Sequence, residues 1–128
     1  FDVVDFKTGA PPSKKEVMAG FAPQLPLEAA MVSRGGFSGI PSGDISELAF
    51  WRLSGGREPG AISAAADDAA TVAAEAYAGL VALVAKFDNE TTPYEARPRP
   101  DKAPKYSDYE HLARVKEWST ATDGETES

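Results

Sequence analysis

Residues 63–87 constrain the fold most, because their apolar side chains recur every three or four positions. That period is typical of an amphipathic α-helix with one buried face. The repeating positions are Ala69, Val72, Ala73, Ala76, Leu80, Leu83, Val84 and Phe87. Acidic residues Asp67 and Asp68 lie in its early turns and Lys86 in its last, in agreement with the helix dipole. The alanine-rich face indicates close packing of this helix on a sheet.

Two short strands are predicted before this helix. Residues 3–6 form a β-branched and aromatic run that ends in the turn-forming residues 7–12. Residues 45–53 have the composition of a second strand, with Phe50 and Trp51 as core residues, and residues 54–60 read as a loop.

Two helices are expected between the strands. Ser13 precedes Glu16 by three residues, which is the spacing of a capping box at a helix start. A second helix is expected from about Gln24, with Pro26 tolerated in its first turn, to the glycine pair at positions 35 and 36.

The order strand, helix, strand, long helix predicts an α/β fold with a βαβ unit and helices packed on the sheet. Two strands alone make no stable sheet, so further strands are expected from sequence outside this chain or from a partner. The chain opens inside a strand at Phe1, without a methionine, and we therefore expect a piece of a longer polypeptide. One domain is expected over residues 1–118, with an irregular proline-rich segment and a short helix at 106–118, followed by a disordered acidic tail at 119–128.

The composition of the chain excludes several classes of function. Its 128 residues suffice for one domain with a modest core. The absence of cysteine excludes disulfides, cysteine-ligated zinc and thiol catalysis. We expect no apolar run of membrane-spanning length. The formal charge of −7 argues against a protein that binds nucleic acid through net charge alone.

Asp5 and Lys7 form the pattern that indicates chemistry. Alternate residues of a strand point to one face, so these two side chains are expected to share a surface while Phe6 turns into the core. A carboxylate is a suitable ligand for a hard cation such as Mg²⁺, and a lysine can orient a water and stabilise charge on a phosphate. The pattern alone is weak, because a surface salt bridge of small energetic value has the same spacing.

The wider sequence resembles the core of RecB-family PD-(D/E)XK nucleases. The resemblance rests on the string DFKTG at residues 5–9 and on Gln24 in the following helix. The strings WRLSGG at 51–56 and HLARVKEW at 111–118 look like the C-terminal end of AddB-type subunits of bacterial double-strand-break repair enzymes. The similarity covers nearly the whole chain.

The resemblance implies a truncated restriction-endonuclease-like core, strand–helix–strand–long helix, followed by an irregular C-terminal segment with a short helix. It implies that Asp5 is a metal ligand, Lys7 the catalytic lysine and Gln24 a residue that contacts the site or the scissile strand. The implied activity is Mg²⁺- or Mn²⁺-dependent DNA exonuclease action in double-strand-break repair by homologous recombination.

The same resemblance implies partners and a compartment. These are DNA, with single-stranded ends, and an AddA-type helicase–nuclease subunit, in the cytoplasm and without a membrane. Self-association of the fragment is a further possibility, because a second copy would complete the sheet.

Three departures from the family pattern limit what is carried over. The family has a further acidic ligand upstream of the D-x-K strand, which would lie before Phe1, so we expect the isolated chain to be inactive. The tyrosine expected four residues after Gln24 is replaced by Glu28. The chain has no cysteines, so no iron–sulfur cluster is expected.

Two other interpretations stay open. The first is a non-catalytic DNA-binding or scaffold module of the same repair complex, and the second is an unrelated small α/β interaction domain. Residues 97–116 are locally basic, with Tyr106 and Tyr109 among them, and are equally compatible with DNA-backbone contact and with packing against a larger enzyme.

Overall fold

The computed structural model describes residues 1–57, 59–95 and 112. Phe1–Asn89 form one compact unit, and the fold and the site described below belong to it. Apart from Leu112, the basic segment at 97–116, the expected helix at 106–118 and the expected tail at 119–128 lie outside the described residues.

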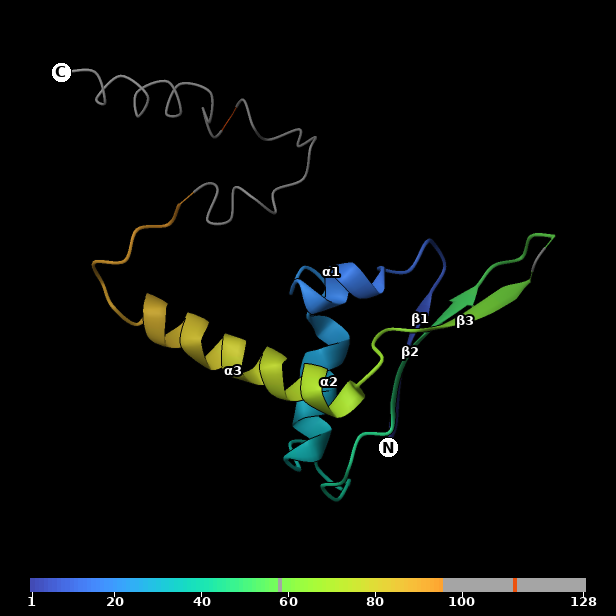
Figure 1. Cartoon of the computed structure of the whole chain (residues 1–128), viewed down its shortest axis with the longest axis horizontal. Coiled ribbons are helices and arrows are strands. Elements are labelled where there is room, and N and C mark those ends of the chain that lie inside the picture. The colour runs from blue at the N-terminus through green and yellow to red at the C-terminus, as the bar shows by residue number, and fades with distance from the viewer. Residues whose placement is uncertain (58, 96–111, 113–128) are drawn as a thin grey trace. The chain divides into compact units, whose positions relative to one another are not determined.

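The unit has an α/β fold, as predicted, with helices packed on a three-stranded mixed sheet (Figure 1). Its elements in order are β1 (Asp2–Lys7), α1 (Lys14–Met18), α2 (Gln24–Ser33), β2 (Glu47–Leu53), β3 (Gly60–Ala64) and α3 (Ala69–Phe87). The strand order is β1-β2-β3; β1 runs parallel to β2, and β3 runs antiparallel to β2. The expected parallel pair of strands with helices between them is therefore confirmed.

The third strand was not expected, and the helix predicted from residue 63 starts later. Residues 60–64 pair with β2 and form β3, and α3 begins at Ala69. The sequence GAISA contains only one β-branched residue, so its strand conformation comes from pairing with β2 and not from local propensity. The helix start is set by Asp68, which caps α3 by accepting a 2.9 Å hydrogen bond from the Thr71 amide. The chain thus supplies its own third strand, and the expectation that further strands come only from elsewhere is wrong.

The helix starts before β2 follow the sequence signals. The Ser13 amide donates to the Glu16 carboxylate at 2.8 Å, and Glu16 N–H bonds the Ser13 hydroxyl in return, so the predicted capping box is present. Helix α2 begins at Gln24, as expected, and accommodates Pro26 in its first turn. Gly35 follows α2 with φ +69°, a conformation that glycine adopts without strain.

The core lies between α2, α3 and one face of the sheet. Its buried residues are Val17, Leu25, Ala29, Ala30, Ile45, Leu48, Phe50, Ala65, Ala69 and Ala73. Val3 of β1 packs against this cluster. Because alternate strand residues share a face, Asp5 and Lys7 lie on this same helix-covered side of the sheet.

The opposite face of the sheet carries exposed aromatic side chains. Phe6 is 61% exposed and Trp51 39% exposed, so the predictions that both lie in the core are wrong, whereas Phe50 is buried as predicted. Phe6 points away from Asp5 through the alternation of the strand, and no described helix covers that side. The two rings contact each other edge to face, with centroids 5.7 Å apart.

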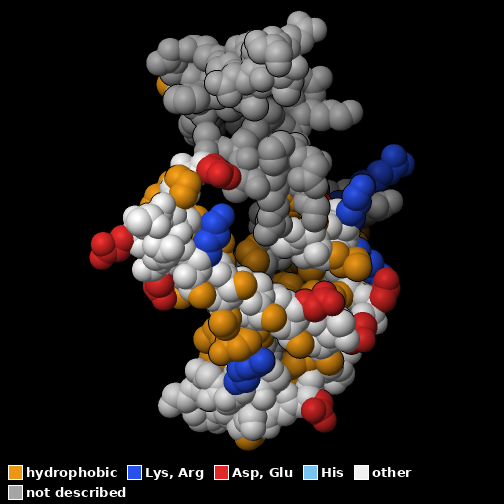
Figure 2. Space-filling model, turned by 60° about the vertical axis from the view of Figure 1, so that its left-hand side comes forward, with side chains coloured by type: hydrophobic (Ala, Val, Ile, Leu, Met, Phe, Trp, Pro, Cys, Tyr) orange, Lys and Arg blue, Asp and Glu red, His pale blue; other side chains and the backbone are white. Residues whose placement is uncertain are grey.

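Helix α3 is the longest helix among the described residues, and its composition is mostly apolar. By length and composition its 19 residues could cross a membrane, contrary to the expectation that no segment would. One such helix is weak evidence for a membrane span, since the long core helices of soluble proteins satisfy the same criterion. Its first turns carry the buried Ala69 and Ala73, whereas the apolar side chains of its second half are exposed. Figure 2, which turns the α3 side forward, shows hydrophobic side chains open at the surface between scattered charges.

Candidate active site

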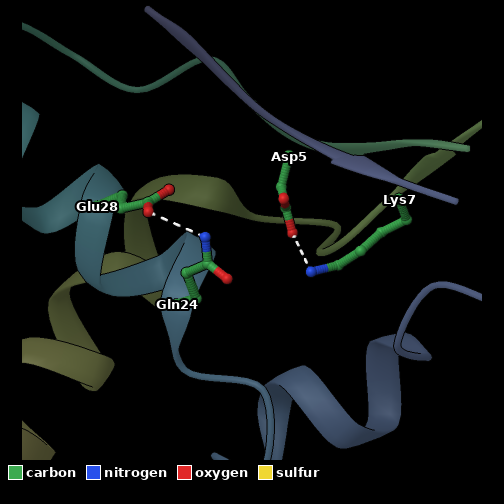
Figure 3. Close-up of polar contacts among 4 residues, drawn as sticks. All are labelled: Asp5, Lys7, Gln24 and Glu28. Atoms are coloured by element: carbon green, nitrogen blue, oxygen red, sulfur yellow. Dashed lines mark hydrogen bonds and ion pairs between the residues drawn. The ribbon is translucent and has the colours of Figure 1, made fainter.

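Asp5 and Lys7 meet at the carboxyl end of β1. The ammonium nitrogen of Lys7 lies 2.6 Å from Oδ2 of Asp5 (Figure 3). Both side chains emerge on the helix-covered side of the strand, because residues two apart in a strand point the same way. The structure therefore brings together the two residues that the sequence singled out.

The environment of this ion pair is partly sheltered. The Asp5 side chain is 13% exposed and that of Lys7 is 32% exposed. Oδ2 of Asp5 is buried and makes no hydrogen bond within the described residues, so Lys7 is the group that compensates its charge there. The Lys7 ammonium also lies 6.0 Å from the centre of the buried Phe50 ring. The pair is less solvated than a typical surface salt bridge, yet the lysine remains accessible.

Gln24 lies on the facing helix, at the start of α2. Its side-chain amide donates to Oε1 of Glu28, one turn further along, at 3.1 Å. Figure 3 shows this pair on α2 and the Asp5–Lys7 pair on β1 as two separate pairs. Within the described residues no hydrogen bond joins them. Glu28, where the family pattern has a tyrosine, thus holds the amide of the glutamine that was expected to contact the substrate.

A divalent cation needs more ligands than these residues supply. Mg²⁺ takes six oxygen ligands, of which at least one or two are normally protein carboxylates, and substrate phosphates and waters complete the shell. Among the described residues there is no group of three or more Asp, Glu, His or Cys side chains that could hold a metal. The Oδ2 atom of Asp5 faces an ammonium, which is a competitor for a cation. The described residues alone therefore do not fit a complete Mg²⁺ or Mn²⁺ site; Asp5 can offer one ligand position.

A pocket opens where β1 and β2 end. Six residues line its cavity of about 470 Å³: Thr8, Gly9, Ala10, Arg52, Ser54 and Arg57. Arg52 is the neighbour of Lys7 across the parallel pair, so both side chains leave the sheet on the same side. The pocket is therefore next to the Asp5–Lys7 pair.

Sequence reasoning missed the two arginines of this pocket. From the sequence, Arg52 was predicted to lie in the second strand and Arg57 in the following loop, and neither was predicted to be a site residue. The usable signal was the strand register: in the parallel pair, Lys7 at the end of β1 lies opposite Arg52, the residue before the last of β2. Comparisons with protein-family models, curated proteins and solved structures find no match for the chain.

Proposed function

We propose that this chain is part of a metal-dependent DNA nuclease with a restriction-endonuclease-like core, and that it contributes Asp5 and Lys7 to the phosphodiesterase site. The observation that carries the proposal is the contact between these two side chains at the end of a strand, beside a pocket with two arginines. Carboxylate, lysine and arginine are the side chains that hold cations and phosphates in such sites.

The roles follow from the chemistry of each group. Lys7 places a positive charge where a non-bridging oxygen of the scissile phosphate gains charge during hydrolysis. Asp5 would provide one oxygen ligand if Mg²⁺ or Mn²⁺ were bound, and the metal would polarise the scissile phosphate and an attacking water. Gln24 donates from the helix that faces the strand, and its amide can exchange Glu28 for a substrate oxygen because both are acceptors.

The resemblance to AddB-type subunits sets the wider context of this proposal. It points to exonuclease action on single-stranded DNA ends, together with an AddA-type helicase–nuclease, in cytoplasmic repair of double-strand breaks by homologous recombination. The family pattern has a further acidic ligand besides the D-x-K carboxylate, and on that ground we propose that the isolated chain of 128 residues is inactive.

The experiment measures cleavage of labelled single-stranded DNA by the longest natural polypeptide that contains this chain. We expect cleavage with Mg²⁺ or Mn²⁺, none with a chelator, and a large loss in the Asp5→Asn variant, which keeps the size of the side chain but removes its charge. Equal cleavage by Asp5→Asn and the unaltered protein excludes a role for Asp5. Chelator-sensitive cleavage by purified residues 1–128 contradicts the expectation of inactivity.

A second candidate is a non-catalytic DNA-binding or scaffold module. The observation that favours it is the ion pair itself, in which Asp5 is already neutralised by Lys7. The described part of the chain also has no group of three or more Asp, Glu, His or Cys side chains that could hold a metal. DNA binding by the same polypeptide, measured beside its cleavage of DNA, separates the two candidates. If the polypeptide binds DNA but does not cleave it with any divalent cation, the result supports the non-catalytic module.

A further inference from the structure

The pocket at the carboxyl ends of β1 and β2 has the lining of an anion site. Its six lining residues include two arginines, two hydroxyl side chains and no carboxylate. This is unusual in a chain whose formal charge is −7. The pocket is open, and its volume of about 470 Å³ leaves room for an extended ligand and not only for a single small ion.

Arg52 is the residue that most needs a ligand there. Its Nε atom is buried and makes no hydrogen bond within the described residues. A buried polar atom without a partner is costly, and more so when it belongs to a charged group. Arg52 cannot lose its proton to avoid this cost, because a guanidinium stays charged in proteins. An anion in the pocket, which Arg52 lines, would compensate the charge of this guanidinium.

The geometry of arginine favours one class of anion. A guanidinium offers parallel N–H donors that match two oxygens of a phosphate, and such charge-assisted bonds are about twice as strong as neutral ones. The Thr8 hydroxyl adds a donor at the rim of the same pocket, where its side chain is exposed. Arg57 adds a second exposed guanidinium from the loop between β2 and β3.

The position of the pocket relates it to the Asp5–Lys7 pair. Lys7 and Arg52 are register partners on adjacent strands, so their backbones are about 4.8 Å apart. A nucleic-acid strand with one phosphate at Lys7 would carry its neighbouring phosphates past Arg52 and Arg57.

We propose that this pocket binds the phosphate backbone of single-stranded DNA next to the phosphate held by Lys7, with Arg52 and Arg57 as the ligand-contacting residues. The proposal deepens the proposed nuclease function. It rests on that function for the placement of one DNA phosphate at Lys7. Binding at the pocket does not itself require a metal, so it is measurable without cleavage.

The experiment measures binding of a fluorescent oligothymidylate to the full chain by anisotropy, in chelator and over a series of salt concentrations. The variants are Arg52→Met, Arg57→Met and the double variant. The control is Lys86→Met, which removes the same charge from the last turn of α3, at the other end of the fold. Inorganic phosphate serves as competitor to separate a site for free phosphate from one for the DNA backbone.

We expect each arginine variant to weaken binding about three- to tenfold at low salt, and the double variant to lower the salt slope by about 1.4, or 0.7 for each lost phosphate contact. Lys86→Met should change the affinity less than about twofold. Arg52→Lys should bind the oligothymidylate more tightly than Arg52→Met, because lysine keeps the positive charge and loses only the parallel N–H donors of the guanidinium. Inorganic phosphate should compete only at far higher concentration than unlabelled oligothymidylate.

The proposal would be overturned by no binding of the oligothymidylate at low salt, or by an equal effect of Lys86→Met and the arginine variants. Displacement of the DNA by low concentrations of inorganic phosphate would also overturn it, in favour of a free-phosphate site. If circular dichroism shows that Arg52→Met is unfolded, Arg57→Met in the exposed loop decides the outcome. If binding depends on the arginines but the longest natural polypeptide does not cleave DNA, the pocket proposal stands and the nuclease proposal fails. If that polypeptide cleaves DNA but binding does not depend on the arginines, the nuclease proposal stands and the pocket proposal fails.

Discussion

The ammonium nitrogen of Lys7 lies 2.6 Å from Oδ2 of Asp5, and the carboxylate oxygen in this pair is buried. Each of the two groups therefore compensates the charge of the other in the structure. A nuclease site requires both to change partner, with a cation at Asp5 and a phosphate at Lys7. The ion pair therefore affects both the stability of the fold and the proposed cleavage of DNA, and each effect is tested by its own measurement.

The structural consequence concerns the stability of the Lys7→Met variant. Removing the ammonium leaves a buried carboxylate oxygen without a partner, which costs about 1–3 kcal/mol of unfolding free energy. The double variant Asp5→Asn/Lys7→Met should recover part of this loss, because the uncompensated charge is gone. Urea denaturation of both variants measures their free energies of unfolding. A change in Lys7→Met of less than about 0.3 kcal/mol indicates instead an ordinary surface salt bridge.

The core contributes most of the stability through the helix-covered face of the sheet. Leu48, the second residue of β2, is fully buried, whereas Leu53 at the end of the strand is 54% exposed. We expect Leu48→Ala to lower the unfolding free energy by about 3 kcal/mol, through lost burial and the cavity left behind. Leu53→Ala makes the same chemical change and should cost less than about 0.5 kcal/mol. Similar losses in the two variants would contradict the assignment of the buried face.

Two helix caps predict how the stability depends on pH. Hydrogen bonds from the Ser13 side chain and backbone lower the pKa of Glu16, and bonds from the Thr71 amide and hydroxyl lower the pKa of Asp68. A carboxyl with a lowered folded-state pKa stabilises the fold above its unfolded pKa, and this contribution disappears as the pH falls through the folded value. Stability should therefore fall below a pH of about 4, where unfolded carboxyls take up protons.

The Asp68→Asn variant tests this source of pH dependence. Asparagine also caps helices, so the helix should remain while the titrating group is removed. Thermal unfolding of the variant should depend less steeply on pH in the acid range than that of the unaltered chain. An unchanged acid profile in a variant that also lacks the Glu16 carboxylate would show that other groups cause the loss.

Local signals predicted much of the fold. The capping box of Ser13 and Glu16, the start of α2 at Gln24 and the parallel pairing of the two predicted strands all appear in the structure. These features depend on residues within a few positions of one another, or on simple connection rules. β3 could not be predicted in this way, because Gly60–Ala64 has little strand propensity and becomes a strand only through β2.

The faces of the sheet were predicted only in part. The two-residue period placed Asp5 and Lys7 together, and the structure agrees. The period does not say which face the helices cover, so Phe6 was assigned to the core although it is 61% exposed. Arg52 was missed as a site residue for a related reason, since its position beside Lys7 depends on the register of two strands far apart in sequence.

Gln24 provides a further prediction about the site. Loss of one hydrogen bond to a charged phosphate corresponds to about 1.5 kcal/mol, so Gln24→Ala should slow cleavage by the longest natural polypeptide that contains this chain about tenfold. Glu28→Ala removes the acceptor that holds the Gln24 amide and should change the rate less than about threefold. The rates are measured in single-turnover experiments. A larger loss in Glu28→Ala than in Gln24→Ala would instead identify Glu28 as the residue that acts at the site.

The most direct test of the account is the cleavage rate of the Lys7→Ala variant of the longest natural polypeptide that contains this chain. Lys15→Ala is the matched control, because Lys15 is an exposed lysine of α1. We predict that Lys7→Ala lowers the single-turnover rate of metal-dependent cleavage of single-stranded DNA about 100- to 1000-fold, while Lys15→Ala lowers it less than about twofold. An undiminished rate in a folded Lys7→Ala variant would contradict the proposal that Asp5 and Lys7 form part of a phosphodiesterase site.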